Sequence, residues 1–518
     1  MTTRRMMRWI LIPAVACGIA SAWEIAGASA MAQSIGVPWS VLGHDAQHTA
    51  ISRFTANTLN RVEWQTPVDL DPQYSGNELF IHYGSPIVTR ANTVVIPVKT
   101  GAWDGFQVEG RSATTGTLIW TGTTDYVLPA HDWTPSCGIA ITPQNQVYYP
   151  GAGGTVYYRN SADAATTGTG QIAFYGMANY LAASGTYQAN VQIDTPLTAD
   201  RYGDIFFGFE VSGTTPIGLQ SGIARIDTSG SGTWISATAA AGGDTSIIKV
   251  VMNCAPALSN DHKTLYMAVS QGTWAGGYLV ALDSRTLAPI AHVLLKDVHY
   301  PGNDAYLVDD GTASPTVGPD GDVYFGVLEN PSLSNHDRGW MLHFDSTLSI
   351  SKTAGAFGWD DTPSIVPASA VPTYTGTSTY LLLTKYNNYA NPGIGGDGIN
   401  KVAVLDPNAT ETDPVSGSAV MNEVITIAGV TPDTQYLATE PNAVKEWCIN
   451  SAVIDPSTKC AIVNSEDGKV YRWNFPTNTF TQSVVLTSGL GEAYTPSLVG
   501  PDGTVYVINN ATIFAVGP

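Results

Sequence analysis

The sequence is poor in charge, in cysteine and in helix-forming stretches. Charged residues make up only 13% of its 518 residues, whereas it holds 52 glycines and 31 prolines. None of its five cysteines is adjacent to another, and no C-x-x-C spacing occurs, so the patterns of covalent haem attachment and zinc ribbons are missing. It also has no G-x-S-x-G and no phosphate-binding P-loop motif. These absences exclude the sites that are recognised from local sequence alone and indicate a turn-rich, β-rich chain.

A long apolar run is found only at the N-terminus. Arg4, Arg5 and Arg8 precede the apolar residues 9–22, a stretch too short to span a membrane comfortably. Small residues at 28–32 offer a cleavage site. The sequence therefore predicts a signal peptide over residues 1–32 and an exported protein, periplasmic or extracellular. The choice between the general and the twin-arginine export route stays open.

The charge of the chain limits its partners. With 23 basic and 43 acidic residues, the net charge is −20. Nucleic acid and anionic membrane surfaces repel such a chain, and the same sign disfavours a polyanionic substrate. We expect no nucleic-acid partner and no transmembrane segment. A small molecule, a saccharide or a protein remain as partners, and the oligomeric state is undetermined.

A phrase that recurs every few tens of residues predicts a repeat architecture. Its clearest copy is Ala313-Ser314-Pro315-Thr316, followed by Pro319-Asp320-Gly321 and Val323-Tyr324-Phe325. Seven copies carry the proline, and in an eighth Asn450 stands in its place. The prolines are Pro86, Pro135, Pro196, Pro256, Pro315, Pro363 and Pro496. Fixed-period similarity of this kind indicates stacked or ring-like repeats.

Each repeat contains four short strand-like runs, which is typical of a propeller blade. In the first repeat the runs are 86–89, 93–98, 106–112 and 117–121, separated by Gly, Asn and Thr turns. We predict an all-β, eight-bladed β-propeller of four-stranded antiparallel blades. A single short helix is expected over residues 177–189.

Closure of the ring supports the count of eight. The last repeat ends at Pro518 one strand short, while residues 61–66 form a strand-like run without a blade of its own. Pairing these two ends removes two exposed strand edges. We therefore divide the chain into a signal peptide (1–32), an N-terminal extension (33–60) and one propeller domain (61–518). Seven blades is the alternative, because the seventh copy is degenerate.

The residues that precede each inner strand should surround the mouth of the central channel. This column is rich in acids, histidines and indoles, which favours a polar, aromatic-walled pocket for a small ligand or saccharide. The alternative is that these side chains hold the loops and seal the channel. The ligand-binding candidates are His82, Tyr83, Trp133, Asp194, Asn253, Trp359, Asp360, Trp447 and Tyr494. The catalytic candidates are His131, Asp132, Asp361, Glu446 and Glu492.

Several chemistries fit such a column. Paired carboxylates do glycosidase work at the right separation, or bind Ca²⁺ through their oxygens. Histidine with tyrosine supplies the base and acid of a polysaccharide lyase. The sequence leaves open whether the protein is an enzyme and which residues bind a metal. The disulfide state of Cys137, Cys254, Cys448 and Cys460 is open as well.

Three features resemble the PQQ-like propellers, the superfamily of quinoprotein alcohol dehydrogenases and the outer-membrane assembly propeller. They are the repeated Ser/Thr-Pro phrase, the element Ala113 to Trp120 that is similar to the tryptophan-docking motif, and Trp39 followed by Gly43-His44-Asp45. The resemblance implies the propeller fold over residues 39–517.

The catalytic members of that superfamily carry an adjacent cysteine pair, a metal-binding set and often a haem domain. This chain has neither the cysteine pair nor the haem motif. We therefore expect ligand or partner binding at an acidic, aromatic channel mouth without bound PQQ. The alternatives are a carbohydrate-active lyase or hydrolase and a divergent quinoprotein dehydrogenase.

Overall fold

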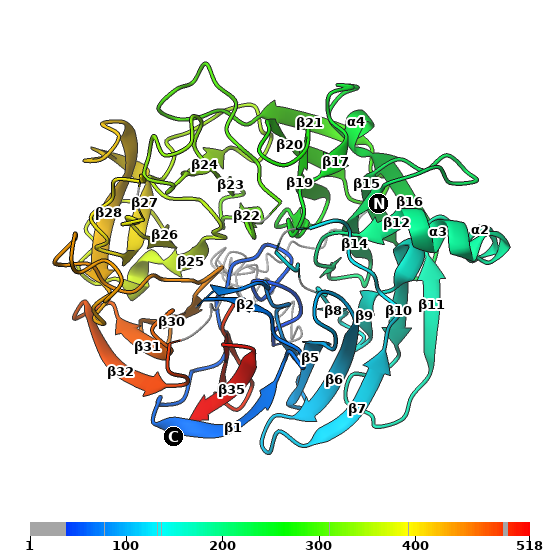
Figure 1. Cartoon of the computed structure of the whole chain (residues 1–518), viewed down its shortest axis with the longest axis horizontal. Helices are drawn as coiled ribbons and strands as arrows, with labels where there is room; N and C mark the ends of the chain where they lie inside the picture. Colours follow the sequence, from blue (N-terminus) through cyan, green and yellow to red (C-terminus); the bar gives the residue numbers. More distant parts are fainter. Residues whose placement is uncertain are drawn as a thin grey trace, which may run out of the picture. The chain divides into compact units, whose positions relative to one another are not determined.

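The computed structural model describes residues 38–518, apart from 77, 132, 136, 310, 392 and 490–495 (Figure 1). The predicted signal peptide lies outside the described residues. So do three candidate site residues, Asp132, Glu492 and Tyr494.

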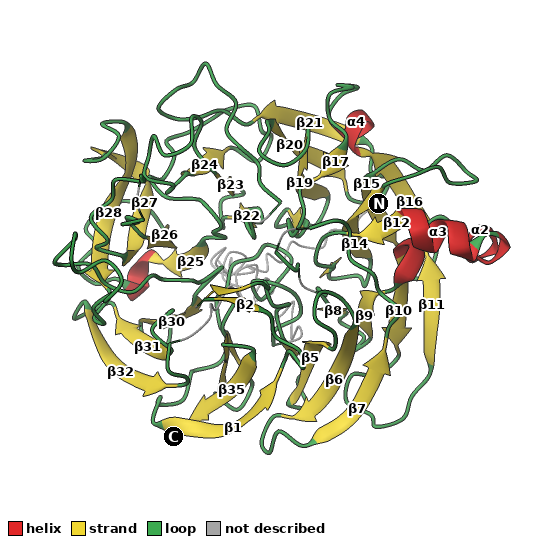
Figure 2. Ribbon diagram, viewed as in Figure 1, coloured by secondary structure: helices red, strands yellow, loops and turns green. Residues whose placement is uncertain are grey.

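Eight antiparallel sheets are arranged in a ring, as predicted (Figure 2). Blade 1 comprises β4 (Ile87–Val88), β5 (Thr93–Lys99), β6 (Phe106–Ser112) and β7 (Leu118–Thr123); blade 2 comprises β8 (Ala140–Ile141), β9 (Val147–Pro150), β10 (Thr155–Arg159) and β11 (Thr169–Ala173). Blade 3 comprises β12 (Val191–Ile193), β13 (Thr198–Ala199), β14 (Ile205–Val211), β15 (Gly222–Ile226) and β16 (Gly232–Ser236); blade 4 comprises β17 (Lys249–Val250), β18 (Ala257–Leu258), β19 (Thr264–Ser270), β20 (Gly277–Asp283) and β21 (Pro289–Leu294). In these two blades the inner strand is in two pieces.

The second half of the ring is less regular. Blade 5 comprises β22 (Thr316–Val317), β23 (Val323–Val327) and β24 (Trp340–Phe344); blade 6 comprises β25 (Ser364–Pro367), β26 (Tyr380–Tyr386), β27 (Lys401–Thr412) and β28 (Ala419–Ala428). Blade 7 comprises β29 (Val453–Asp455), β30 (Cys460–Asn464), β31 (Lys469–Asn474) and β32 (Thr479–Val485). In blade 5, residues 351–355 contact β24 through isolated bridges where a fourth strand would lie. The irregular spacing before the seventh repeat reflects the long strands and loops of blade 6.

The N-terminal strand closes the ring, as the sequence predicts. Blade 8 comprises β33 (Leu498–Val499), β34 (Val505–Asn509), β35 (Thr512–Gly517) and β1 (Arg61–Pro67). The outer strand β1 runs antiparallel to β35, with Arg61 opposite Gly517 and Pro67 opposite Thr512. The eight-bladed prediction is confirmed, and the seven-bladed alternative is wrong.

Strand pairing corrects the register of the repeat. In blade 5, Thr316, the residue after Pro315, pairs with Tyr324, the second residue of β23. In blade 8 the second residue of β34 pairs with Leu498, so Ser497 occupies the position that Pro315 has in blade 5. In blade 2 the second residue of β9 pairs with Ala140, so Ile139 occupies that position. The predicted equivalences of Pro496 and Pro135 with Pro315 are therefore wrong. Proline marks the approach to an inner strand but does not fix its first residue.

Residues 38–60, which we call the hub segment, lie against the inner strands. Backbone hydrogen bonds of 2.7–2.9 Å join the segment to the inner strands of five blades: Ile141 N–H to Ser40 O, Leu258 N–H to Ala46 O, Val317 N–H to Gln47 O, Ile365 N–H to Thr49 O and Ile454 N–H to Ala50 O. Trp39 forms a bridge with Val88 of blade 1. Since an inner strand has no neighbouring strand on its channel side, these bonds satisfy backbone groups that would otherwise be exposed.

Side chains of the hub segment are buried in the channel. Trp39 and His48 are fully buried. His48 Nδ1–H donates to the Pro315 carbonyl over 2.7 Å, and burial lowers the pKa of His48 to about 4, so the ring is neutral at physiological pH. The Gln47 amide donates to the carbonyls of Leu258 and Ser259, each at 3.1 Å. The segment is thus tied to blades 4 and 5 by side chains as well as backbone.

Tryptophans dock outer strands onto the next blade. Trp64 of β1 donates from Nε1 to the Ala113 carbonyl of blade 1 over 2.6 Å. Trp120 of β7 donates in the same way to Ala162 in blade 2, also over 2.6 Å. The element that resembles the family's docking motif therefore has that structural role here.

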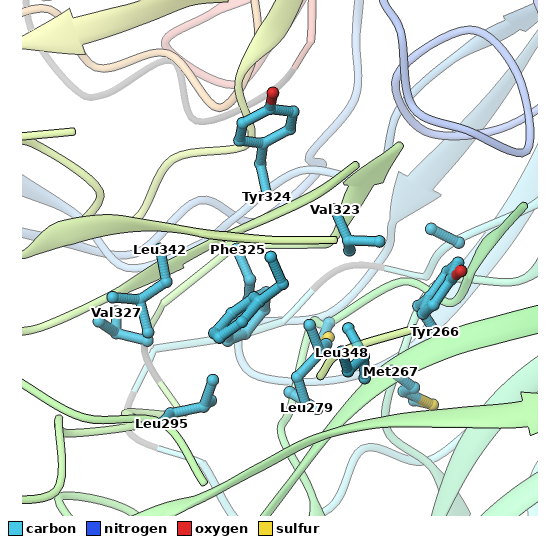
Figure 3. Packing of buried hydrophobic residues seen from close by; sticks show 14 of the residues in the cluster. Tyr266, Met267, Leu279, Leu295, Val323, Tyr324, Phe325, Val327, Leu342 and Leu348 are labelled. Atoms are coloured by element: carbon cyan, nitrogen blue, oxygen red, sulfur yellow. The ribbon is translucent and has the colours of Figure 1, made fainter. Parts of the chain in front are cut away.

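The core lies between the blades. Figure 3 shows Tyr266, Met267 and Leu279 of blade 4 near Val323 and Phe325 of blade 5, all of them buried. Alternation along these strands places such residues on the faces that neighbouring blades share.

Helices are few and short. The segment expected as one helix forms two, α2 (Met177–Ala182) and α3 (Ser184–Asn190), separated at Ala183, whose φ of −151° is not helical. The remaining elements are α4 (Ala237–Ala240), the 3₁₀ turns η1 (Ala152–Gly154) and η2 (Ala368–Ala370), and a hairpin of β2 (Tyr74–Ser75) and β3 (Glu78–Leu79). Among the described helices, none combines the length and the apolar character that a membrane span requires.

We expect Trp39→Ala to lower the free energy of unfolding by about 3–5 kcal/mol, because it empties a fully buried indole site in the hub. Urea unfolding followed by circular dichroism measures the change. The control is Trp274→Ala, which removes an indole that is 51% exposed and should change the value by less than about 0.5 kcal/mol. Equal effects of the two changes would contradict a structural role of the hub segment.

Candidate functional site

Two sets of loops lie at the same end of the blades. The loops that precede the inner strands meet the loops that join the second strands to the third, because first and second strands are antiparallel. We call this end the mouth. All the described candidate residues belong to its loops or lie directly beside them.

Most of the candidate side chains are buried in these loops. His82, Tyr83, Asp194, Asn253, Asp360, Asp361 and Trp447 each have an exposed fraction of 5% or less. His131, Trp133, Trp359 and Glu446 are partly exposed. The mouth therefore has buried polar groups beneath a smaller set of accessible aromatic and acidic side chains.

Tyr83 belongs to a buried ion-pair group in blade 1. Its hydroxyl donates to Asp69 Oδ2 over 3.2 Å, and Asp69 Oδ1 lies 2.8 Å from Lys99 Nζ. The Lys99 ammonium also donates to the carbonyls of Asp71, Gly101 and Ala102. Burial raises the pKa of Asp69, against the opposing effect of Lys99. This group fixes the first loop of the mouth.

Four aromatic rings form a continuous row beside that loop, the aromatic strip. Phe80 lies 6.0 Å from Trp103 and 5.3 Å from Trp133 between ring centroids, and Trp133 lies 5.4 Å from His82. Trp103 is 49% exposed and Phe80 is partly exposed. The strip joins predicted His82 and Trp133 to two rings outside the predicted column.

An acid and a histidine lie beside the aromatic strip. Burial raises the pKa of Asp104, next to Trp103, and the charge of His131 opposes that shift. His131 Nδ1–H donates to the Pro129 carbonyl over 2.6 Å, so its orientation is fixed by its own loop. Both groups border the accessible end of the strip.

A second buried group surrounds Lys249 between blades 3 and 4. Lys249 Nζ lies 3.0 Å from Glu210 Oε2 and 3.0 Å from Asp309 Oδ2. Burial raises the pKa of Asp194 well above its usual range, with Lys249 opposing. Neither carboxylate oxygen of Asp194 has a hydrogen-bond partner among the described residues.

Asn253 lies with Asp194 in this group. Its backbone N–H donates to the Asp194 carbonyl over 2.9 Å, and its side-chain amide donates to the carbonyls of Asp309 and Gly311, each over 3.4 Å. The structure thus brings two predicted residues together, with a lysine and two acids that the column did not include.

Asp360 and Asp361 lie beneath the mouth between blades 5 and 6. Asp360 Oδ1 accepts from the Thr312 backbone over 2.6 Å and from the Thr312 hydroxyl, while its Oδ2 lies 3.4 Å from Lys385 Nζ. Burial raises the pKa of Asp361 well above its usual range, and the charge of Lys385 opposes this shift. Trp359 lines a cavity of about 20 Å³ with Tyr306 and other apolar side chains, which is room for little more than one water molecule.

Among the described residues, Glu446, Cys448 and Glu466 form a cluster of potential metal ligands at the mouth. One ligand atom of each lies within 4.8 Å of the others. Burial raises the pKa of Glu446 to about 8, and the charge of Glu466 adds to the shift. A thiol with two carboxylates suits a borderline ion such as Zn²⁺. Lys445 competes for this set, because its Nζ lies 3.7 Å from Glu466 Oε1.

Trp447 contributes to packing in blade 7. It is buried, its Nε1 donates to the Asn400 carbonyl over 3.3 Å, and its ring contacts those of Tyr471 and Phe480. Trp447 is in the predicted column because it precedes the inner strand β29, and its buried ring packs within the blade.

No protein-family model matches this chain, and no curated protein sequence does so either. Solved structures match it over most of its length. A europium-containing methanol dehydrogenase matches at 12% identity and a TM-score of 0.53, covering 93% of this chain and 91% of its own. Quinohemoprotein alcohol dehydrogenase from Comamonas testosteroni matches at 12% identity and 0.55, covering 94% and 82%. BamB from Moraxella catarrhalis matches at 12% and 0.44, covering 88% and 98%. The chain has the PQQ-like β-propeller fold, and at this identity the likeness shows the fold alone.

We expect Glu446→Gln to make the protein more stable than wild type at pH 8, by about 1–3 kcal/mol, and to have little effect at pH 5. The folded pKa of Glu446 lies above its usual value of 4.5, so wild-type stability is full below that value and falls as pH rises toward 8. Glutamine keeps the uncharged state throughout. Thermal unfolding of both proteins across this range measures the difference.

The control for that experiment is Glu440→Gln, which changes a partly exposed glutamate of a neighbouring loop. It should not reproduce the gain in stability at pH 8, because Glu440 lies outside the cluster that Glu446 forms with Glu466. A pH-independent effect of Glu446→Gln would show that the Glu446 carboxyl is not held protonated in the folded protein.

Proposed function

We propose that the protein is an exported binding propeller that holds an amino saccharide against the aromatic strip of its mouth, without quinone redox chemistry. The observation that carries this proposal is the accessible row of Trp103, Phe80 and Trp133, which ends at His82 and is bordered by Asp104. Sugar rings present apolar C–H faces that pack on indole and phenyl rings, while nearby polar groups fix their hydroxyls.

The charge of the mouth favours one kind of saccharide. Each of Lys99, Lys249 and Lys385 is held by one or more carboxylates, so little positive charge is left for an incoming anion. A uronate would meet a predominantly negative surface, whereas the ammonium of an amino sugar is attracted to it. An ammonium over the face of Trp103 would gain further from the ring quadrupole.

The residues present are a poor fit for PQQ. The quinone is a planar tricarboxylate, and the mouth lysines that could pair with it, Lys99, Lys249, Lys385 and Lys445, already contact carboxylates of the protein. No two of the four described cysteines are adjacent in sequence. Calcium would have to displace Lys249 from Glu210 and Asp309, so neither group is part of the proposed function.

A carbohydrate hydrolase is the second candidate, and Glu446 favours it. With a pKa of about 8, Glu446 carries a proton at neutral pH, as a general acid requires. Glu466 lies close enough to act as its partner carboxylate. Release of reducing ends from a bound oligosaccharide, abolished by Glu446→Gln, would establish this candidate over simple binding.

We expect Trp103→Ala to weaken binding of a glucosamine hexamer at least tenfold, because the variant removes the accessible end of the aromatic strip. Isothermal titration calorimetry measures the affinity, with hexagalacturonate as the anionic probe that should not bind. Added salt should weaken the interaction with the cationic hexamer.

The matched control is Trp274→Ala, which removes a similarly exposed indole from another blade of the mouth. It should leave the affinity unchanged. Equal losses in the two variants, or tight binding of hexagalacturonate, would refute the proposed site.

A further inference from the structure

A groove outside the mouth runs along the seam between blades 2 and 3. It has a volume of about 770 Å³ and is lined by β9, β10 and β11 on one side and by the turn before β16 on the other. Both β11 and β16 are outer strands of their blades (Figure 1). The volume falls in the range of sites that enclose small ligands. We call it the seam groove.

The seam groove is uncharged in a strongly acidic protein. None of the described residues that line it is Asp, Glu, Lys or Arg, although the net charge of the chain is −20. A site for an ion or a nucleotide would carry charge of the opposite sign. The lining therefore selects for a ligand without formal charge.

Amide and hydroxyl groups supply the polar contacts of the groove. Gln146, Asn160 and Gln171 line one wall, and Thr228, Ser229 and Ser231 line the facing turn. Gln146 Nε2 donates to Asn160 Oδ1 over 3.2 Å. The Asn160 amide N–H groups, and one lone pair each on Asn160 Oδ1 and Gln146 Oε1, then remain for a ligand.

These polar side chains are held in place before any ligand binds. Gln171 Nε2 donates to Thr155 Oγ1 over 2.8 Å, and Tyr148 donates from its hydroxyl to Gln146 Oε1 over 3.2 Å. Preorganised donors and acceptors are what recognition of hydroxyl groups requires, since little side-chain entropy is then lost on binding.

Aromatic rings complete the wall. Tyr148 and Tyr158 lie 6.0 Å apart between centroids and 36° from parallel, and Trp234 lies across the groove. Glycine at 170 permits this arrangement, because a Cβ there would lie 2.4–2.5 Å from the Tyr158 ring. Rings beside amides and hydroxyls match a sugar, which has apolar faces and a rim of hydroxyls.

The facing turn is rigid. The Asp227 carboxylate accepts from the backbone N–H groups of Ser229 and Ser231, at 2.8 and 3.0 Å, and from the Ser229 hydroxyl at 2.6 Å. Gly232 brings the turn against blade 2, since a Cβ at this position would lie 1.8 Å from the Phe174 carbonyl oxygen. The groove thus has two fixed walls.

We propose that the seam groove is a second binding site, and that it takes a neutral oligosaccharide. The site is independent of the proposed function at the mouth: it shares no residue with the aromatic strip, and its lining carries no charged side chain. Its ligand is a chain of uncharged hexoses, recognised by amides, hydroxyls and aromatic faces together.

The test is titration calorimetry of the full-length protein with cellohexaose and maltohexaose, at low and high salt. At least one hexaose should bind, with an affinity that does not change with salt because no charge takes part. Ser231→Trp, which fills the groove from an exposed position on the turn, should weaken binding at least tenfold. Tyr158→Ala should do the same by removing one face.

The matched control is Ser349→Trp. Ser349 is an exposed serine of a turn in blade 5 that an aspartate, Asp345, holds in the same way. This variant should bind like wild type, and so should Trp103→Ala at the mouth. Thermal unfolding checks that each variant is folded. If Ser231→Trp or Tyr158→Ala is not folded, Asn160→Lys, which places a charge in the groove, takes its place.

Three results would overturn the proposal. One is the absence of binding by both hexaoses at millimolar concentration. The second is equal affinity of wild type and Ser231→Trp. The third is loss of hexaose binding in Trp103→Ala with retention in Ser231→Trp, which would assign the ligand to the mouth. Failure of the glucosamine hexamer to bind, by contrast, would refute only the proposal for the mouth.

Discussion

Backbone pairing between the hub segment and the inner strands is the constraint on which the rest of the molecule depends. Most inner strands are only two to four residues long, and each has one edge toward the channel. The hydrogen bonds from residues 38–60 pair with such edges in blades 1, 2, 4, 5, 6 and 7, and β1 then continues directly into blade 8. One continuous piece of chain therefore fills the hub and closes the ring. The segment pairs near the ends of the inner strands that are remote from the mouth.

Buried acids at the mouth mainly form ion pairs with lysines of the same protein. Lysines at or near strand ends, Lys99, Lys249 and Lys385, each hold a carboxylate from another loop. Such pairs add little net stability once desolvation is counted, but breaking one leaves an uncompensated buried charge. They consequently fix the loop geometry. The accessible groups of the mouth include the aromatic strip and the Glu446 cluster.

The sequence predicted the blade count and the closure because both depend on local patterns, a repeated turn phrase and a strand-like run at each end. It misplaced the register at Pro135 and Pro496, because proline tolerates several positions before a strand. The candidate column found Asp194, Asp360 and Glu446 but not their lysines, which come from strands elsewhere in the blades. The seam groove has no signal in the sequence: its walls join residues about 60–90 positions apart whose adjacency exists only after two blades pack.

Specificity at the two proposed sites follows from exclusion as much as from attraction. A net charge of −20 repels polyanions from the whole surface, so neither site needs a device against uronates or phosphates. At the mouth the same negative field attracts an ammonium. The wall of the seam groove contains no charged side chain. A cation that entered it would lose hydration free energy without gaining an ion pair. Uncharged sugars lose little by leaving water for a wall of amides, hydroxyls and rings, which is why the two sites separate ligands by charge although both use aromatic faces.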